Sequence, residues 1–142
     1  MTARSLADAL RGSSDEALAE LLGARPELVS PVPADLGQLA ARATTAPSVA
    51  RALDRLDRWT LQVLEAVCAV ADPSAADPPT YAQVRALLPQ AGDTDVRVAV
   101  DRLLTLALLW GDDDRLNVVG GVRDVIGTHP GGLGPSLRTL LA

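Results

Sequence analysis

Hydrophobic residues in the first 58 positions recur at helical spacing between short polar breaks. Leu18, Leu21 and Leu22 lie at positions i, i+3 and i+4, and Ser13 precedes Glu16 by three residues. This is the order of a capping box followed by an apolar helix face. Similar patterns predict three more helices, over residues 5–11, over residues 35–43 and after the expected N-cap Ser48. We therefore expect a layer of short helices in this part of the chain.

From Trp59 onward the pattern first continues as helices and then changes to strands. Helices are predicted over residues 59–71, after the N-cap Thr80, which Gln83 follows three residues later as in a capping box, and after a cap at Asp93 or Thr94. The apolar run that ends at Trp110 leads into the polar turn GDDD and a second apolar run, which is typical of a β-hairpin. Three helices followed by strand, turn and strand is the order of a winged helix-turn-helix.

The predicted fold class is mainly α, with an N-terminal helical layer packed on a winged helix-turn-helix that carries a small β-hairpin wing. The expected parts are residues 1–58 for the layer, 59–122 for the winged-helix unit and 123–142 for a Gly- and Pro-rich tail. In the tail, Leu137, Leu140 and Leu141 begin a further apolar helical stripe. The stripe fits two interpretations: the front part of a longer chain, or a short terminal helix docked on the core.

Composition and charge limit the kinds of core and the classes of function that we expect for this protein. The chain has 142 residues, 48% of them hydrophobic and none of them Phe, so the core must consist of Leu, Val and Ala. All 13 basic residues are Arg, as GC-rich codon usage would produce. The formal net charge of −5 is unfavourable for a nucleic-acid binder, whose affinity comes mostly from neutralising phosphates. A local basic stripe is still compatible with this charge.

The sequence carries no pattern typical of export, membrane insertion or catalysis. Its first residues lack the apolar core of a signal peptide, and no apolar run reaches the ~18 residues of a membrane span. The expected location is the cytoplasm. Cys68 is the single cysteine and is expected to be a buried structural thiol, and His129 has no nucleophile or carboxylate partner nearby in sequence. No cofactor, metal site or catalytic residue is predicted.

Arg97 and Arg102 are candidates for DNA contacts. If their helix is a recognition helix, both lie on its solvent face within reach of base edges or phosphates. Asp93 and Asp95 at the start of that helix would repel phosphates, and Arg97 can instead pair with Asp101 four residues later. The favoured interpretation is a solvated scaffold helix, and DNA recognition is the alternative.

The predicted wing has an acidic tip. It carries Asp112, Asp113 and Asp114, and only Arg115 could contact a phosphate. Each approach of a carboxylate to a phosphate costs on the order of 1 kcal/mol at ~4 Å in water. We therefore expect a wing that does not touch DNA and whose tip prevents edge pairing or meets a basic partner surface. A divalent-ion site is disfavoured because the spacing lacks the D-x-D-x-D-G pattern.

A second basic feature is the stripe formed by Arg51, Arg55 and Arg58 at i, i+4 and i+7. It could follow a phosphate backbone, but Asp54 and Asp57 lie close by and reduce its field. An exposed, mutually paired helix face is the favoured interpretation. The candidates for contact with a protein partner are apolar: Trp110, Leu137, Leu140 and Leu141.

Three stretches of the chain resemble a known family. They are SLADALRG with LAELLGARPELVSPVPADLGQLAARA, then RALDRLDRWTLQVLEAVC, and finally HPGGLGPS. Together they are similar to the N-terminal region of the XPB-type helicase conserved C-terminal domain proteins of high-GC Gram-positive bacteria, which are much longer. The resemblance implies a winged-helix region in a DNA-transaction context, without an active site in this segment. The sequence also lacks the phosphate loop G-x-x-x-x-G-K-[ST], because it has no Lys.

The expected function is a non-catalytic accessory module of a helicase-associated DNA-transaction protein. It would act mainly through contacts with the remainder of a longer chain or with a protein partner. The alternative is a DNA-binding winged helix, in repair or transcription regulation, that uses Arg97, Arg102 and the Arg51, Arg55 and Arg58 stripe. A stand-alone enzyme is a third class, for which the sequence supplies no nucleophile, metal cage or phosphate loop.

Overall fold

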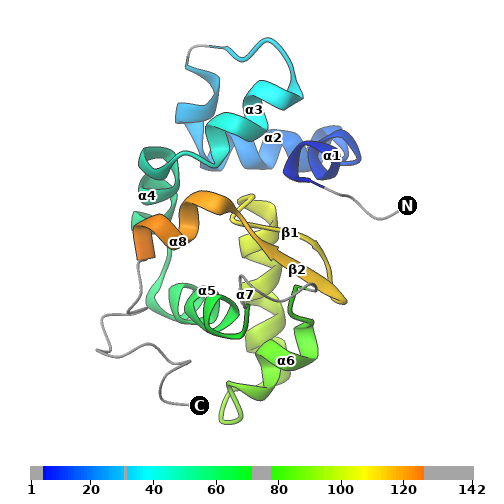
Figure 1. Cartoon of the computed structure of the whole chain (residues 1–142), viewed down its shortest axis with the longest axis vertical. Coiled ribbons are helices and arrows are strands. Elements are labelled where there is room, and N and C mark those ends of the chain that lie inside the picture. Colours follow the sequence, from blue (N-terminus) through cyan, green and yellow to red (C-terminus); the bar gives the residue numbers. More distant parts are fainter. Residues whose placement is uncertain (1–4, 31, 72–77, 127–142) are drawn as a thin grey trace.

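The computed structural model describes residues 5–30, 32–71 and 78–126, which are mostly helical with one small antiparallel hairpin (Figure 1). The first half forms α1 (Leu6–Arg11), α2 (Asp15–Ala24), the 3-10 helix η1 (Pro26–Val29), α3 (Leu36–Ala43) and α4 (Ala46–Asp54). The second half forms α5 (Arg58–Val70), α6 (Tyr81–Ala86), α7 (Asp93–Thr105), β1 (Leu109–Asp112), β2 (Arg115–Val118) and α8 (Gly120–Ile126). The mainly helical class and the predicted order of three helices and two strands are confirmed.

The two groups of elements share one aliphatic core. In Figure 1, α1–α3 lie at the top and α5–α7 at the bottom, with α4, α8 and the hairpin between them. A continuous hydrophobic cluster joins Leu10 and Leu39 from the first group to Leu64, Val96 and Leu116 from the second. The core is built from Leu, Val and Ala, as the composition predicts.

Side-chain hydrogen bonds cap the N-termini of several helices. Gln83 N donates to the Thr80 hydroxyl at 3.1 Å, and Thr80 N donates to the Gln83 side chain at 2.8 Å. This is the predicted capping box at the start of α6. Asp57 caps α5 by accepting a 2.7 Å hydrogen bond from Thr60 N, and that bond is the main reason why the pKa of Asp57 is lowered.

Three other predicted N-caps are wrong, and two of them belong to α2 and α7. Ser14, and not Ser13, caps α2, because Ser14 has an extended backbone and its hydroxyl accepts a hydrogen bond from the first turn. Helix α7 follows Gly92, which has no side chain with which to cap it. Asp93 and Thr94 therefore both lie within the helix, where Asp93 acts on the helix dipole and does not cap it.

A buried arginine joins the two groups of helices. Arg25 is 0% exposed and donates hydrogen bonds to the carbonyl oxygens of Ala43 and Leu106, each 2.9 Å long, and to the Ser48 hydroxyl at 2.8 Å. Ser48 thus lies inside α4 and faces this guanidinium, so the prediction that it caps a helix is wrong. Burial lowers the pKa of Arg25, and the Glu27 carboxylate, 3.7 Å from its Nε, opposes that effect.

Helix α7 ends in a left-handed turn that directs the chain into β1. The N–H of Leu108 donates to the carbonyl of Leu103, and the N–H of Ala107 donates to that of Leu104, both at 3.1 Å. This is the Schellman arrangement, in which the residue after the helix adopts a positive φ. Ala107 has a φ of 56°, at a position that usually carries Gly.

The hairpin is short and is attached to the segment before α6. Asp112 lies opposite Arg115, which leaves a two-residue turn between the strands. Gly111 has a φ of 113°, and a Cβ at that position would lie 2.1 Å from the Arg115 carbonyl oxygen. The N–H of Leu116 donates a 2.9 Å hydrogen bond to the carbonyl of Pro79. The edge of β2 is therefore partly paired.

The sequence pattern does not predict α8, which occupies residues placed at the end of the winged-helix unit and the start of the tail. This helix packs against α4 and buries Val122 completely. Gly121 permits the close approach, because a Cβ there would lie 2.2 Å from the Thr44 carbonyl oxygen. The expected boundary at residue 122 thus falls inside a helix.

Candidate nucleic-acid and partner interfaces

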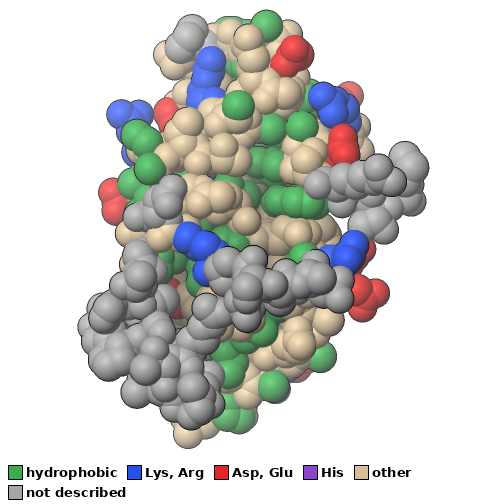
Figure 2. Space-filling model, viewed as in Figure 1, with side chains coloured by type: hydrophobic (Ala, Val, Ile, Leu, Met, Phe, Trp, Pro, Cys, Tyr) green, Lys and Arg blue, Asp and Glu red, His purple; other side chains and the backbone are tan. Residues whose placement is uncertain are grey.

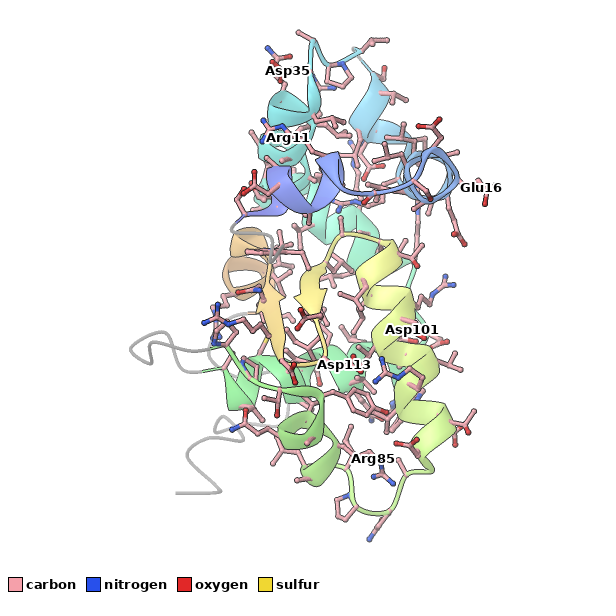
Figure 3. The ribbon with its side chains drawn as sticks, turned by 90° about the vertical axis from the view of Figure 1, so that its right-hand side faces the viewer. Arg11, Glu16, Asp35, Arg85, Asp101 and Asp113 are labelled. Atoms are coloured by element: carbon pink, nitrogen blue, oxygen red, sulfur yellow. The ribbon has the colours of Figure 1, made fainter. Side chains whose placement is uncertain are left out.

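The outward face of α7 holds Arg97 in a network of carboxylates. Its Nη1 and Nη2 donate to the two carboxylate oxygens of Asp113, each at 2.9 Å, and Nη1 also lies 3.3 Å from Asp101. The predicted pairing with Asp101 is confirmed, and the bond to the hairpin is added to it. In Figure 3, Asp113 lies at the hairpin tip beside α7, which carries Asp101. The hydrogen bonds that Arg97 donates to Asp113 are the main cause of the raised pKa of Arg97.

Tyr81 completes the surroundings of Arg97. The guanidinium carbon lies 3.9 Å from the centre of the Tyr81 ring, which is a cation–π contact. The Tyr81 hydroxyl lies 3.2 Å from an Asp93 carboxylate oxygen. Partial burial, and then the Asp93 charge, raise the pKa of Tyr81. Arg97 is thus held between an aromatic ring and two carboxylates, and a phosphate that used its two terminal nitrogens would have to displace Asp113.

Asp112 and Asp113 at the hairpin tip have different partners. Asp112 accepts a 2.9 Å hydrogen bond from the backbone N–H of Asp114, which closes the turn. Asp113 binds Arg97 through its side chain and accepts a hydrogen bond from the Tyr81 N–H through its carbonyl, at 2.6 Å. The acidic tip is therefore part of the fold, because it fastens the hairpin to α6 and α7.

The other predicted DNA-contact residues of this region lie on the surface. Arg102 is exposed on α7, where its charge contributes to lowering the pKa of Asp57. Arg115 is exposed on β2. Val98 projects from the same helix with 61% of its surface exposed. The α7 face therefore presents one apolar and one basic side chain besides the Arg97 network.

The predicted arginine stripe is not a single helix face. Arg51 lies within α4, Arg55 is the C-cap of that helix, and Arg58 is the first residue of α5. The chain turns between the two helices, where Asp57 caps α5, so the assumed continuous helical spacing is wrong. Arg55 also donates a hydrogen bond to the carbonyl of Ala24, which ties it to the end of α2.

Trp110, the one predicted partner contact within the described residues, lines a surface groove. The groove has a volume of about 220 Å³ and lies between α1 and α2 on one side and the end of α7 with β1 on the other. Trp110 is half-buried and packs against the core. Leu137, Leu140 and Leu141 lie outside the described residues, as does His129.

The single cysteine, Cys68, is buried in α5, as predicted. Burial raises the pKa of its thiol to about 11, so the thiolate is scarce at neutral pH. Among the described residues, no three His, Cys, Asp or Glu side chains are grouped to hold a metal ion. No helix in the described ranges is both long and apolar enough to cross a membrane.

Sequence reasoning missed two of the groups that hold Arg97, and it missed the burial of Arg25. Tyr81 and Asp113 lie 16 residues from Arg97 on either side, and no local pattern connects them. Arg25 follows α2 in a segment whose sequence is typical of a helix end, and nothing in that sequence indicates burial.

No family model matches the chain, and comparisons with curated proteins and with solved structures find no significant similarity. The resemblance to helicase-associated proteins stays a prediction.

Proposed function

We propose that this chain is a non-catalytic winged-helix module that acts mainly through contacts with proteins. In this interpretation α5, α6 and α7 are the three helices, α7 is the recognition helix and the β1–β2 hairpin is the wing. The hydrogen bond between Leu116 and Pro79 supports it, because it adds the segment before α6 to the sheet edge. The helicase-associated, DNA-transaction context rests on the sequence resemblance alone.

One observation carries the proposal: Arg97, the residue on α7 best placed to contact DNA, is already hydrogen-bonded to a carboxylate. Both terminal nitrogens of Arg97 donate hydrogen bonds to Asp113. This is the bidentate geometry in which an arginine binds a phosphate or a guanine. A nucleic acid would have to break this pair and approach a turn that carries three carboxylates. Coulombic repulsion therefore opposes DNA at the surface where a winged helix normally binds it.

The alternative function is DNA binding through α7, and the exposed Arg102 and Val98 are the observations that favour it. An arginine can bind guanine, and an apolar side chain can contact a thymine methyl group. This alternative requires Arg97 to leave Asp113 when DNA arrives.

A titration with labelled duplex DNA distinguishes the two functions. The full chain is added to a fluorescein-labelled duplex at about 20 mM salt, where phosphate contacts are strongest, and anisotropy is recorded. We expect no saturation below about 100 µM, the weak limit of non-specific binding, and the same curve for Arg97→Ala. Micromolar binding that falls steeply with salt and is lost in Arg97→Ala would overturn the proposal.

A further inference from the structure

The groove beside Trp110 is apolar and is formed by elements that are distant in sequence. Seven of its lining residues are large and hydrophobic: Leu6, Leu10, Leu18, Leu21, Leu104, Leu109 and Trp110. They come from α1, α2, α7 and β1. Figure 2 shows hydrophobic side chains across the middle of this face, between the N-terminal helices above and the hairpin below. The groove is therefore open at the surface and lined by core-like side chains.

The volume and the lining of the groove argue against a small-molecule site. Its volume of about 220 Å³ is below the ~300–1,000 Å³ of typical ligand pockets. Its polar lining includes the hydroxyls of Ser13 and Thr105, and Ser13 already donates to the carbonyl of Ala9. A site of this kind has few groups with which to orient a polar ligand, but its apolar lining can contact apolar side chains.

The side of the groove formed by α1 and α2 carries an excess of carboxylates. Over residues 5–24, which form α1 and α2, four carboxylates face one guanidinium: Asp8, Asp15, Glu16 and Glu20 against Arg11, a net charge of −3. On the other side, Asp112 follows the lining residue Gly111, while Asp101, three residues before Leu104 on α7, is paired with Arg97. In Figure 3, Glu16 on α2 and Asp101 on α7 lie on the same side of the molecule, one above the other.

We propose that this groove binds an amphipathic helix of a partner protein, with an apolar ridge of leucine-sized residues flanked by Lys or Arg. Helices that bind in grooves place apolar anchors at i, i+3 or i+4 and i+7, which matches an open apolar channel. The acidic α1–α2 side favours basic flanks by complementary charge. This inference deepens the proposed protein-contact function and rests on it.

Trp110 reports directly on occupation of the groove. The full chain with Trp59→Phe has a single tryptophan, and its emission is followed during titration with two tryptophan-free helical peptides. The peptides share leucines at i, i+3, i+4 and i+7, and differ only in carrying lysines or glutamates beside them. We expect the basic peptide to bind at least tenfold more tightly, and the difference to shrink as salt rises.

Two matched variants locate the binding. Ala17 is exposed and lines the groove, so Ala17→Arg obstructs it and repels a basic peptide. Ala82 is exposed on α6 and is not part of the lining, so Ala82→Arg adds the same side chain elsewhere. We expect at least a tenfold loss of affinity for the first variant and no change for the second. Equal effects, equal binding of both peptides, or no binding would overturn the inference.

Other occupants give different outcomes. If Leu137→Ser, Leu140→Ser and Leu141→Ser together shift the Trp110 emission without any peptide, the chain's own C-terminal residues fill the groove and the inference is wrong. If the chain sediments as a dimer that Ala17→Arg dissociates, the occupant is a second copy, and the inference is wrong again. Loss of peptide binding with DNA binding still absent removes the groove inference alone. Tight DNA binding removes the proposed function instead.

Discussion

Arg97 on α7 and Asp113 at the hairpin tip are joined by two parallel hydrogen bonds of 2.9 Å across 16 residues of sequence. The pair is partly exposed, with 34% of the Arg97 side chain and 57% of the Asp113 side chain accessible. Such pairs contribute little to stability, about 0.2–1 kcal/mol. In this protein the pair matters for its geometry. The Asp113 carboxylate binds the Arg97 guanidinium, which would otherwise face a nucleic acid.

Replacing Asp113 should release Arg97. In Asp113→Ala we expect DNA affinity at low salt to rise about fivefold, since removing one repulsive contact is worth about 1 kcal/mol. Asp114→Ala removes the same charge without touching the pair, so its rise should be smaller. Anisotropy titrations of both variants check this, and equal gains would show that Asp113 acts only through net charge.

The buried guanidinium of Arg25 should be a major source of stability. Arg25→Met removes hydrogen bonds to Ala43, Leu106 and Ser48, and leaves their buried oxygens without this donor. We expect the free energy of unfolding to fall by about 2–4 kcal/mol, measured by urea denaturation. The exposed Arg11 serves as control, and Arg11→Met should change stability by less than about 0.5 kcal/mol. A similar effect of both variants would contradict a special role for Arg25.

Two adjacent glycines at the start of α8 should respond differently to alanine. In Gly121→Ala the new Cβ meets the Thr44 carbonyl at 2.2 Å, so α8 must move away from α4, while at Gly120 nothing lies within 4 Å. We expect Gly121→Ala to cost about 1–3 kcal/mol, as overpacking does, and Gly120→Ala to be close to neutral. Thermal unfolding of the two variants tests the packing of α8, and equal midpoints would refute it.

The thiol of Cys68 should be protected at ordinary pH. Its pKa is raised to about 11, so at pH 8 only about one thiol in a thousand is ionised in the folded protein. Reaction with an aromatic disulfide reagent should be at least 100-fold slower than in denaturant. From pH 8 to 10 the native rate should rise about tenfold per unit. Rapid native labelling at pH 8 would show that the thiol is accessible and its pKa ordinary.

The local patterns of the sequence determine much of this fold. Helical spacing of Leu, Val and Ala predicts most helices, and the capping box of Thr80 and Gln83 forms as expected. The turn GDDD between two apolar runs predicts the hairpin. These features depend on residues three or four positions apart, or on the two-residue turn of a hairpin, so the information lies within a short window.

Only the tertiary structure decided which polar groups are free and which are engaged. Arg25 looks like an ordinary surface residue, yet it binds the Leu106 carbonyl, 81 residues away. Ser48 looks like a cap, yet it faces the same guanidinium. The sequence predicts that Arg97 can pair with Asp101, yet Asp113 on the hairpin binds it at the shorter distance. The physical reason is that burial and pairing depend on groups brought together by packing, over distances in sequence that periodicity does not reach.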